Sequence, residues 1–393
     1  MKRRVWCMAW SVAAFIAGTL AVQAQPARPG SDVPMTKAAL PTGVTLSAWG
    51  EDLEHPWGLA LLPQGGALVT ERPGRLRVVS RQGELSAPVA GTPKVDARGQ
   101  GGLLDVALHP DFERNGLVYL TYSEAGPGGN STAVARGRLV QENGQWRFAD
   151  SRVVFRQAPK HSSTLHFGSR LVFARDGKLF VTLGDRYSRR NDAQALDTHH
   201  GKVVRIEDDG AVPADNPFRG RQGALPETWS LGHRNSQGAA LHPSTGELWM
   251  VEHGPRGGDE LNIARAGKNY GWPRYTYGEE YSGGKIGEEA SPPGFDPPLH
   301  SWVPSVSPSG LAFYTSQAIP QWTGSLFTGA LSGQALVRLQ LDGEKVVREE
   351  RLLTDMGRRI RDVEVGPEGE LYLLTDARQG QILVLRRGNP APR

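Results

Sequence analysis

The sequence predicts an all-β fold, a six-bladed β-propeller whose blades are four-stranded antiparallel sheets. The first observation is a recurring hairpin, in which two short apolar strands flank a turn rich in Pro, Asp and Gly. The second is the content of 49 Gly and 28 Pro in 393 residues, which suits many short strands joined by turns. The third is the scarcity of helical periodicity, with one short turn expected over residues 192–196.

The hairpin pattern occurs six times, at a spacing of roughly 45–70 residues that is typical of propeller blades. The copies span residues 57–70, 104–121, 169–182, 238–251, 309–328 and 361–374. Further strands are expected over residues 75–80, 203–206, 335–341 and 381–385. A blade cannot bury both of its faces alone, so neighbouring blades must stack around a common axis. A two-sheet sandwich is the alternative, although sandwiches rarely carry six near-equivalent hairpins. No boundary divides residues 42–388 into two domains.

The first 24 residues have the layout of a secretory signal peptide. Basic residues 2–4 precede an apolar run over residues 5–22, and Val22-Gln-Ala offers a small-residue cleavage site. A membrane anchor is the alternative, because the run is almost long enough to span a bilayer. Polar residues within the run, and Pro26 just after it, favour cleavage.

Cleavage predicts a periplasmic or secreted protein without a membrane span. It would remove Cys7, the single cysteine, so that neither disulfides nor thiolate chemistry would be available. It would leave 42 basic and 41 acidic residues, a balance that gives no sign of nucleic-acid binding. Residues 25–41 contain four prolines and are expected to form a flexible leader to the propeller domain at 42–388.

The densest polar cluster lies directly before the fourth hairpin. Arg234, Asn235 and Gln237 stand between glycines, which let a ligand approach the backbone. A polar turn is the alternative, but loops with so many donors normally serve ligands.

A second polar cluster follows the same hairpin. Asp259, Glu260 and the carbonyls of a Gly-Pro turn are hard oxygen ligands of the kind that Ca²⁺ takes. The spacing is not that of an EF-hand, and solvated turn carboxylates are the alternative.

Two further candidates lie beside the third and sixth hairpins. His166 precedes the third hairpin as a candidate general base, and Asp185 at the far end of that hairpin could orient it. A structural histidine is the alternative. Arg359 and Arg361 alternate at a strand start, so both should project to one side and bind a carboxylate-bearing ligand. A solvated basic edge is the alternative for this pair.

Several common catalytic motifs are missing from the sequence. There is no serine nucleophile elbow, phosphate-binding loop, dinucleotide fingerprint or zinc-spaced set of Cys and His. Their absence argues against the commonest hydrolases and nicotinamide enzymes.

Taken in order, the clusters resemble the soluble glucose/sorbosone dehydrogenases that depend on pyrroloquinoline quinone (PQQ), especially the periplasmic aldose sugar dehydrogenases. The resemblance covers nearly all of residues 42–388. It rests on the motifs Gly99-Gln-Gly-Gly-Leu-Leu, Leu108-His-Pro-Asp-Phe, His166-Phe-Gly-Ser-Arg-Leu, Leu183-Gly-Asp, Gly201-Lys-Val-Val-Arg-Ile, Asp215-Asn-Pro-Phe, Gly232-His-Arg-Asn-x-Gln-Gly, Glu252-His-Gly-Pro, Asp259-Glu-Leu-Asn, Asn269-Tyr-Gly-Trp-Pro and Arg359-x-Arg-Asp.

The resemblance implies a six-bladed propeller, in agreement with the hairpin count, and a set of catalytic residues. His166 matches the general base that takes the proton of the sugar C1 hydroxyl, and Asp185 matches its orienting carboxylate. Arg234 matches the residue that polarises the quinone carbonyl, and Asn235 matches a further quinone contact. Gln100 matches a residue that lines the substrate side of the site.

The resemblance also implies PQQ and Ca²⁺ as cofactors. Because PQQ carries three carboxylates and an ortho-quinone, it requires arginines and a hard divalent cation. The remaining matches are Gln237 in the quinone-contact motif, Arg359 and Arg361 for cofactor carboxylates, the Gly254 and Pro255 carbonyls for the catalytic Ca²⁺, and Glu260 with the Tyr270 carbonyl for a structural Ca²⁺.

The chain departs from the family pattern at two positions. Ser332 stands where family members place a lysine against the cofactor, which leaves two possibilities, weaker PQQ binding or compensation by Arg338 or Lys345. Leu165 stands where some relatives have an acidic residue, so the sugar contacts can differ as well.

The expected function is oxidation of an aldose at C1 to the lactone, with electrons passed to an unidentified external acceptor, by a monomer or homodimer. A Ca²⁺-dependent lactone hydrolase is one alternative, but it would leave Arg359 and Arg361 without an obvious purpose. A sugar- or protein-binding propeller without turnover is the other, since one fold hosts many functions.

Overall fold

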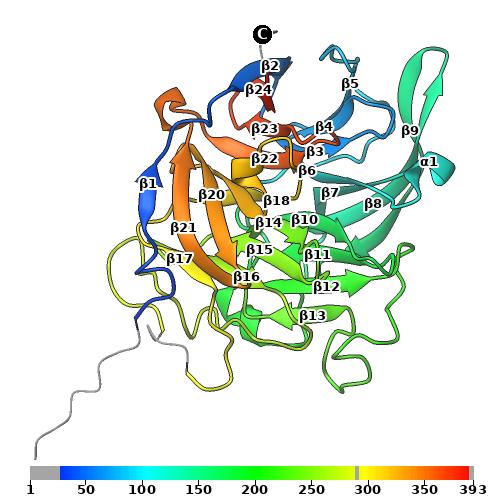
Figure 1. The fold of residues 1–393 in the computed structure, drawn as a ribbon. Coiled ribbons are helices and arrows are strands. Elements are labelled where there is room, and N and C mark those ends of the chain that lie inside the picture. The colour runs from blue at the N-terminus through cyan, green and yellow to red at the C-terminus, as the bar shows by residue number, and fades with distance from the viewer. Residues whose placement is uncertain (1–26, 288–291, 389–393) are drawn as a thin grey trace, which may run out of the picture.

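The fold is a ring of six β-sheets, as seen in a computed structural model that describes residues 27–287 and 292–388. The expected signal peptide lies outside these residues. Figure 1 shows one strand from each blade meeting around the centre of the ring. These innermost strands are β3 (Pro56–Leu61), β6 (Leu103–Leu108), β10 (Gly168–Phe173), β14 (Ser236–Leu241), β18 (Pro308–Tyr314) and β22 (Ile360–Val365).

Each blade continues outward by antiparallel pairing. The second and third strands are β4 (Ala67–Glu71), β5 (Arg75–Val79), β7 (Leu117–Gly126), β8 (Gly129–Glu142), β11 (Leu179–Leu183), β12 (Lys202–Ile206), β15 (Leu248–Glu252), β16 (Asp259–Ile263), β19 (Ser325–Ala330), β20 (Ala335–Asp342), β23 (Leu371–Thr375) and β24 (Gly380–Arg387). The outer strands are β9 (Gln145–Arg156), β13 (Thr228–Leu231), β17 (His300–Trp302), β21 (Lys345–Leu352) and β2 (Val44–Leu53). Blade one has only its three strands β3 to β5.

The two ends of the domain close the ring. β2 pairs antiparallel with β24, so an N-terminal strand completes the last blade beside the C-terminal strands, as Figure 1 shows. Closure leaves no open sheet at the seam between the first and last blades. The six-bladed propeller predicted from the hairpin repeat is thereby confirmed.

A short strand also lies within the segment expected to be a flexible leader. Residues Met35–Lys37 form β1, which runs parallel to β21 on the outside of blade five (Figure 1). The backbone groups on the free edge of β21 accept this pairing because they otherwise have no partner strand. Sequence reasoning missed it because three residues carry no strand periodicity.

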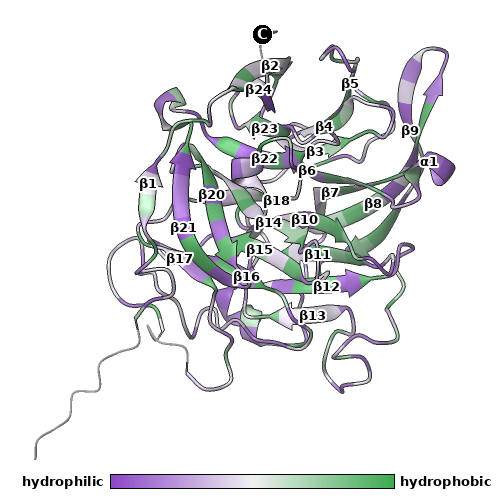
Figure 2. Cartoon of the chain, in the orientation of Figure 1, coloured by the Kyte–Doolittle hydropathy of each residue, from purple (hydrophilic) through white to green (hydrophobic). Residues whose placement is uncertain are grey.

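The hydrophobic core is divided among the blade interfaces. Six of its clusters each join two neighbouring blades, and together they fill every interface in the ring. Figure 2 shows the apolar residues concentrated in the strands and the hydrophilic ones in the connecting loops. This arrangement agrees with the expectation that no blade is stable alone.

Helical structure is limited to short segments in the described residues. They are α1 (Phe112–Asn115) and the 3₁₀ turns η1 (Arg190–Gln194), η2 (Pro320–Trp322) and η3 (Thr354–Met356). The turn η1 overlaps the one expected over residues 192–196. No helix in the described ranges is long and apolar enough to cross a bilayer.

Candidate active site

A cavity of about 560 Å³ lies where the innermost strands begin. In every blade the pairing register shifts within the first residues of the inner strand, so a bulge stands at this end of all six strands. Such bulges redirect side chains. The cavity collects nine of the predicted site residues, which are Gln100, His166, Arg234, Asn235, Gln237, Gly254, Pro255, Arg359 and Arg361.

His166 and Asp185 form a buried pair at one wall of this cavity. His166 Nδ1 lies 2.7 Å from Asp185 Oδ1, and Asp185 also accepts hydrogen bonds from Trp272 Nε1 and the Tyr187 N–H, each at 2.7 Å. Because the Nδ1–H group donates its hydrogen bond to the carboxylate, the Nε2 lone pair of His166 stays free to accept a proton. The proximity expected from the sequence is therefore present.

Burial sets the protonation state of His166. Desolvation lowers the pKa of the imidazole below its usual value, and the charges of Arg234 and Arg186 lower it further, although Asp185 opposes them. The side chain is therefore neutral at pH 7. Its backbone is held in the left-handed region, at φ 52°, while the Gln100 side-chain oxygen accepts the His166 N–H at 2.8 Å. A non-glycine residue in this region is characteristic of functional sites.

Arg234 is held from three directions. Its backbone N–H donates to Glu252 at 2.7 Å, and its Nη1 donates to the carbonyls of His253 and Gly254 at 3.0 and 2.6 Å. The guanidinium lies 5.3 Å from the centre of the Trp272 ring. Its Nε is buried and has no hydrogen-bond partner among the described residues, which leaves a donor for a ligand.

Asn235 and Gln237 link the inner strands of three blades. The Asn235 side-chain oxygen accepts the Gly168 N–H at 3.1 Å and a Gln237 N–H at 3.2 Å. The Gln237 side-chain oxygen accepts Nη1 of Arg361 at 2.9 Å. The amides thus order the polar wall as well as line it.

Arg359 and Arg361 project to the same side, as their alternation predicts. Both approach Asp376 Oδ2, at 2.9 Å from Arg359 and 3.6 Å from Arg361. Arg361 is buried and Arg359 is exposed. Burial alone would raise the pKa of Asp376, but Arg361, His55 and Arg359 together hold it well below its usual range. Asp376 is therefore their ionised counterion, and sequence reasoning missed it because it lies 15 residues from Arg361.

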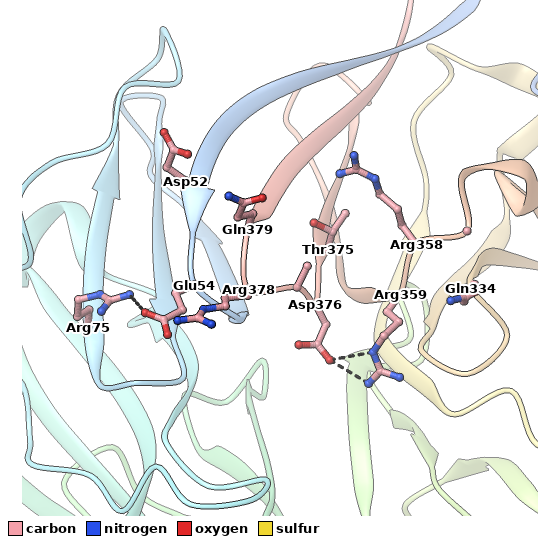
Figure 3. A pocket seen from close by; sticks show the side chains of 12 residues that line it. Asp52, Glu54, Arg75, Gln334, Arg358, Arg359, Thr375, Asp376, Arg378 and Gln379 are labelled. Carbon is pink, nitrogen blue, oxygen red and sulfur yellow. Dashed lines mark hydrogen bonds and ion pairs between the residues drawn. The ribbon is translucent and has the colours of Figure 1, made fainter.

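A second, larger cleft of about 950 Å³ adjoins the cavity. The two hollows share Arg359 and Asp376. Figure 3 shows this ion pair at one end of the cleft and the Glu54–Arg75 pair at the other, with Arg358 and Arg378 along its walls.

The Gly254-Pro255 turn lies at the cavity wall and is clamped by Asp259. Asp259 accepts the N–H groups of Gly254, Val306 and Ser307 at 2.8, 2.8 and 2.7 Å. The carbonyl of Gly254 faces Arg234, and that of Pro255 accepts Ser305 Oγ at 3.4 Å. The turn therefore presents two carbonyl oxygens, a donor type that Ca²⁺ uses.

Glu260 and Tyr270 lie behind the cavity. Glu260 and Glu252 both accept hydrogen bonds from the Asn262 amide, at 3.1 and 2.9 Å. Burial and then the charge of Glu252 raise the pKa of Glu260 well above its usual value. Tyr270 stacks on His233, whose Nδ1 lies 3.1 Å from Glu252. Glu260 and Tyr270 are thus linked through His233 and Glu252.

This buried carboxylate pair has oxygen neighbours that remain unsatisfied. Asn262 Oδ1 and the Tyr275 hydroxyl are buried without hydrogen-bond partners in the described part of the chain. Two close carboxylates and spare oxygens fit a hard cation. No three side chains of His, Cys, Asp or Glu gather as a metal-ligand group in the ranges that the structure describes, so carbonyl and amide oxygens would have to complete either site.

The structure also decides the question raised by Ser332. Ser332 lines the cavity, and its hydroxyl lies 2.8 Å from that of Ser307. Arg338 instead pairs with Glu350 at 2.7 Å within blade five, and Lys345 is exposed at the start of β21. Neither lines the cavity, so the compensation expected from Arg338 or Lys345 is wrong. Arg338 lies on β20 and Lys345 on β21, which are separated from the inner strand β18 by β19.

Known proteins are similar to this chain in both sequence and fold. The profile of the glucose/sorbosone dehydrogenase family matches residues 53–384. The chain is 48% identical to the aldose sugar dehydrogenase YliI of Escherichia coli (strain K12) over 349 residues, which cover 88% of this chain and 93% of the relative.

Solved structures give the same result. The apo form of the soluble aldose sugar dehydrogenase of Escherichia coli superposes with a TM-score of 0.85 at 47% identity, covering 88% of this chain and all of the other. The PQQ-bound aldose sugar dehydrogenase of Streptomyces coelicolor superposes with a TM-score of 0.69 at 28% identity, covering 88% and 99% of the two chains. The resemblance inferred from the motifs is confirmed, and the chain belongs to the glucose/sorbosone dehydrogenase family.

Proposed function

We propose that this protein oxidises an aldose at its C1 hydroxyl to the lactone, using PQQ and Ca²⁺, and passes the electrons to an external acceptor. The observation that carries the proposal is the neutral, Asp185-oriented His166 in a cavity that arginines also line. The relatives named as aldose sugar dehydrogenases, one of them with bound PQQ, support it.

The residues present fit PQQ. The cavity volume lies within the range of about 300–1,000 Å³ that small-molecule sites occupy. Arg359 and Arg361 would pair with cofactor carboxylates, and the buried, unpartnered Nε atoms of Arg361 and Arg234 are donors available to such an anion. Asn235 and Gln237 would complete the polar contacts.

The residues also fit two calcium ions. The carbonyls of Gly254 and Pro255 would hold a catalytic ion beside the cofactor. Glu260 and the Tyr270 carbonyl would contribute to a structural ion behind the cavity, where it would neutralise the buried carboxylates of Glu260 and Glu252.

Each side chain then has one task in the reaction. Bound PQQ supplies the acceptor for the hydride that leaves C1. His166 takes the C1 hydroxyl proton on Nε2, and Asp185 stabilises the imidazolium that results. Arg234 places a fixed positive charge where negative charge develops on the quinone oxygen. Gln100 holds the His166 backbone, which keeps the base in position.

We also propose that the chain is exported to the periplasm or the medium, after cleavage near Ala24. Mass spectrometry of the N-terminus of the exported protein would test this.

Reconstitution tests the proposed reaction. The mature protein, supplied with PQQ, Ca²⁺ and a panel of aldoses, should bleach an artificial dye acceptor only when all three are present. His166→Ala should keep PQQ binding and lose turnover by about 10²- to 10⁴-fold, because general-base catalysis contributes on that scale. Lactone hydrolysis with Ca²⁺ alone would instead identify a lactonase. Ligand binding without turnover in the reconstituted wild-type protein would identify a binding propeller.

A further inference from the structure

Arg72, in the turn after β4, is a charged residue of the cavity wall that the family motifs do not include. Its Nη2 donates to the Gly99 carbonyl at 2.6 Å, which places the side chain beside the Gln100 loop. Its Nε is buried and has no partner in the described parts of the chain. A guanidinium held in this way has donors left for a ligand.

The carboxylates near Arg72 are committed to other residues. Glu71 is buried and pairs with Arg75 at 2.8 Å and Arg77 at 3.3 Å. Asp96 pairs with Arg98 at 2.6 Å. Within residues 27–287 and 292–388, no carboxylate forms an ion pair with Arg72, and Asp376, which lines the same cavity, pairs with Arg359 and Arg361.

The cavity as a whole carries excess positive charge. Its described lining holds five arginines and only two carboxylates. The arginines are Arg72, Arg234, Arg256, Arg359 and Arg361, and the carboxylates are Asp259 and Asp376. Burial lowers the pKa of Arg361 to about 10, and the charges of Arg359 and Arg72 lower it further, although Asp376 opposes them.

We propose that Arg72 is a third carboxylate-binding arginine of this cavity and, with Arg359 and Arg361, replaces the cation that Ser332 does not provide. The inference rests on the proposed function, in which the ligand is the tricarboxylate PQQ. Three guanidiniums from blades one and six would then face an anion of matching charge.

Titration of the ligand-free protein with PQQ, followed by quenching of tryptophan fluorescence, tests this directly, because Trp57 lines the cavity. Arg72→Ala should raise the Kd by about 10- to 150-fold, the scale of one lost hydrogen-bonded charge. The matched control is Arg358→Ala, which removes the same charge from an exposed position outside the cavity and should change the Kd by less than about twofold. Equal Kd values for wild type and Arg72→Ala would overturn the proposal.

Melting of the ligand-free variants separates an anion site from a structural arginine. If Arg72 binds a ligand, Arg72→Ala should melt at or above the wild-type temperature, because one of the like charges that line the cavity is removed. A lower melting temperature together with an unchanged Kd would show a structural role instead.

Citrate serves as a tricarboxylate probe that does not depend on quinone chemistry. It should raise the melting temperature of the wild type and of Arg358→Ala, but much less that of Arg72→Ala. If citrate behaves in this way while PQQ fails to bind the wild type, the result supports the carboxylate-binding site and contradicts PQQ as the cofactor. If citrate stabilises all three proteins equally, the role of Arg72 falls.

Discussion

Arg170 and Arg361 are two buried arginines in similar positions with different surroundings. Each lies on an innermost strand, Arg170 on β10 and Arg361 on β22, and each guanidinium lies near Trp57, at 4.5 and 5.6 Å from its ring centre. Both also donate hydrogen bonds to Gln237. Arg170 donates to the backbone carbonyl of Gln237, and Arg361 donates to the side-chain oxygen of Gln237.

The two arginines differ in their counterions. Arg170 pairs with Asp105 at 2.9 Å and Asp362 at 3.0 Å. Burial alone would lower the pKa of Arg170, but these carboxylates and Glu364 raise it. Among the residues that the structure describes, Arg361 pairs with Asp376 alone, at 3.6 Å, and burial lowers its pKa to about 10.

The carboxylates around Arg170 also join the blades. Asp105 accepts the Leu171 N–H of the next blade at 2.7 Å, and Asp362 accepts the Leu59 N–H across the seam of the ring at 3.0 Å. A buried network satisfied in this way stabilises one arrangement of blades, whereas a buried donor without a partner marks a place for a ligand. The comparison therefore distinguishes Arg170, whose ion pairs stabilise the arrangement of the blades, from Arg361, which has a donor left for a ligand.

The largest effects should come from replacing Arg170 and Arg361 with alanine, one at a time. Arg170→Ala should lower the free energy of unfolding by about 3–5 kcal/mol, because two buried carboxylates lose their cation. Arg361→Ala should lower the free energy of unfolding of the ligand-free protein by less than half of that amount. It should, however, weaken PQQ binding by about 2–5 kcal/mol. Urea unfolding and PQQ titration measure the two quantities. Equal losses in the free energy of unfolding for both variants would contradict the distinction between a stabilising Arg170 and a ligand-binding Arg361.

The next effect concerns pH and the catalytic pair. Because His166 must be neutral to accept a proton, kcat/KM should fall as pH decreases through a pKa below 6.5. In Asp185→Asn the rate should fall by about 10²- to 10⁴-fold, and the acid limb should move to lower pH, since the hydrogen bond to Asp185 raises the pKa of His166. A pH profile of both proteins provides the measurement. An acid limb at or above 6.5 in the wild type would contradict it.

The smallest effect should come from restoring the family lysine. Ser332→Lys adds a cation at the cavity rim, in a partly solvated position beside Ser307, and should tighten PQQ binding by about 0.2–1 kcal/mol. The same fluorescence titration applies, with Ser332→Ala as the control for the lost hydroxyl contact. Weaker binding in the lysine variant would mean that the cavity already holds its full set of cations.

The fold was predictable from the sequence because each blade is a local hairpin. The copies at residues 57–70 and 361–374 each appear as two neighbouring strands, β3 with β4 and β22 with β23. The pairing of β2 with β24 was not visible, since these strands are more than 300 residues apart and neither pattern specifies its partner. The extra strand β1 escaped because its three residues carry no strand periodicity.

The site was predictable only in part. The motifs identified His166 and Asp185, and the structure brings Nδ1 and Oδ1 within 2.7 Å. Asp376 and Arg72 were missed, because each follows a strand in an ordinary polar turn, and nothing in the neighbouring residues indicates that it lines the cavity. Their importance comes from spatial neighbours, since Asp376 pairs with Arg359 and Arg361, and Arg72 lines the same cavity as these two arginines.

The sequence by itself determined the six hairpins, the number of blades and the residue types that family membership implies. All of these follow from apolar alternation, turn residues and motifs that lie within a few positions of one another. Only the tertiary structure decided which arginine is neutralised and which is left for a ligand, because ion pairing depends on distances of a few ångströms between side chains from different blades. Arg170 and Arg361 are the same residue type on inner strands, but the packing of the blades gives Arg170 two carboxylates, Asp105 from blade two and Asp362 from blade six.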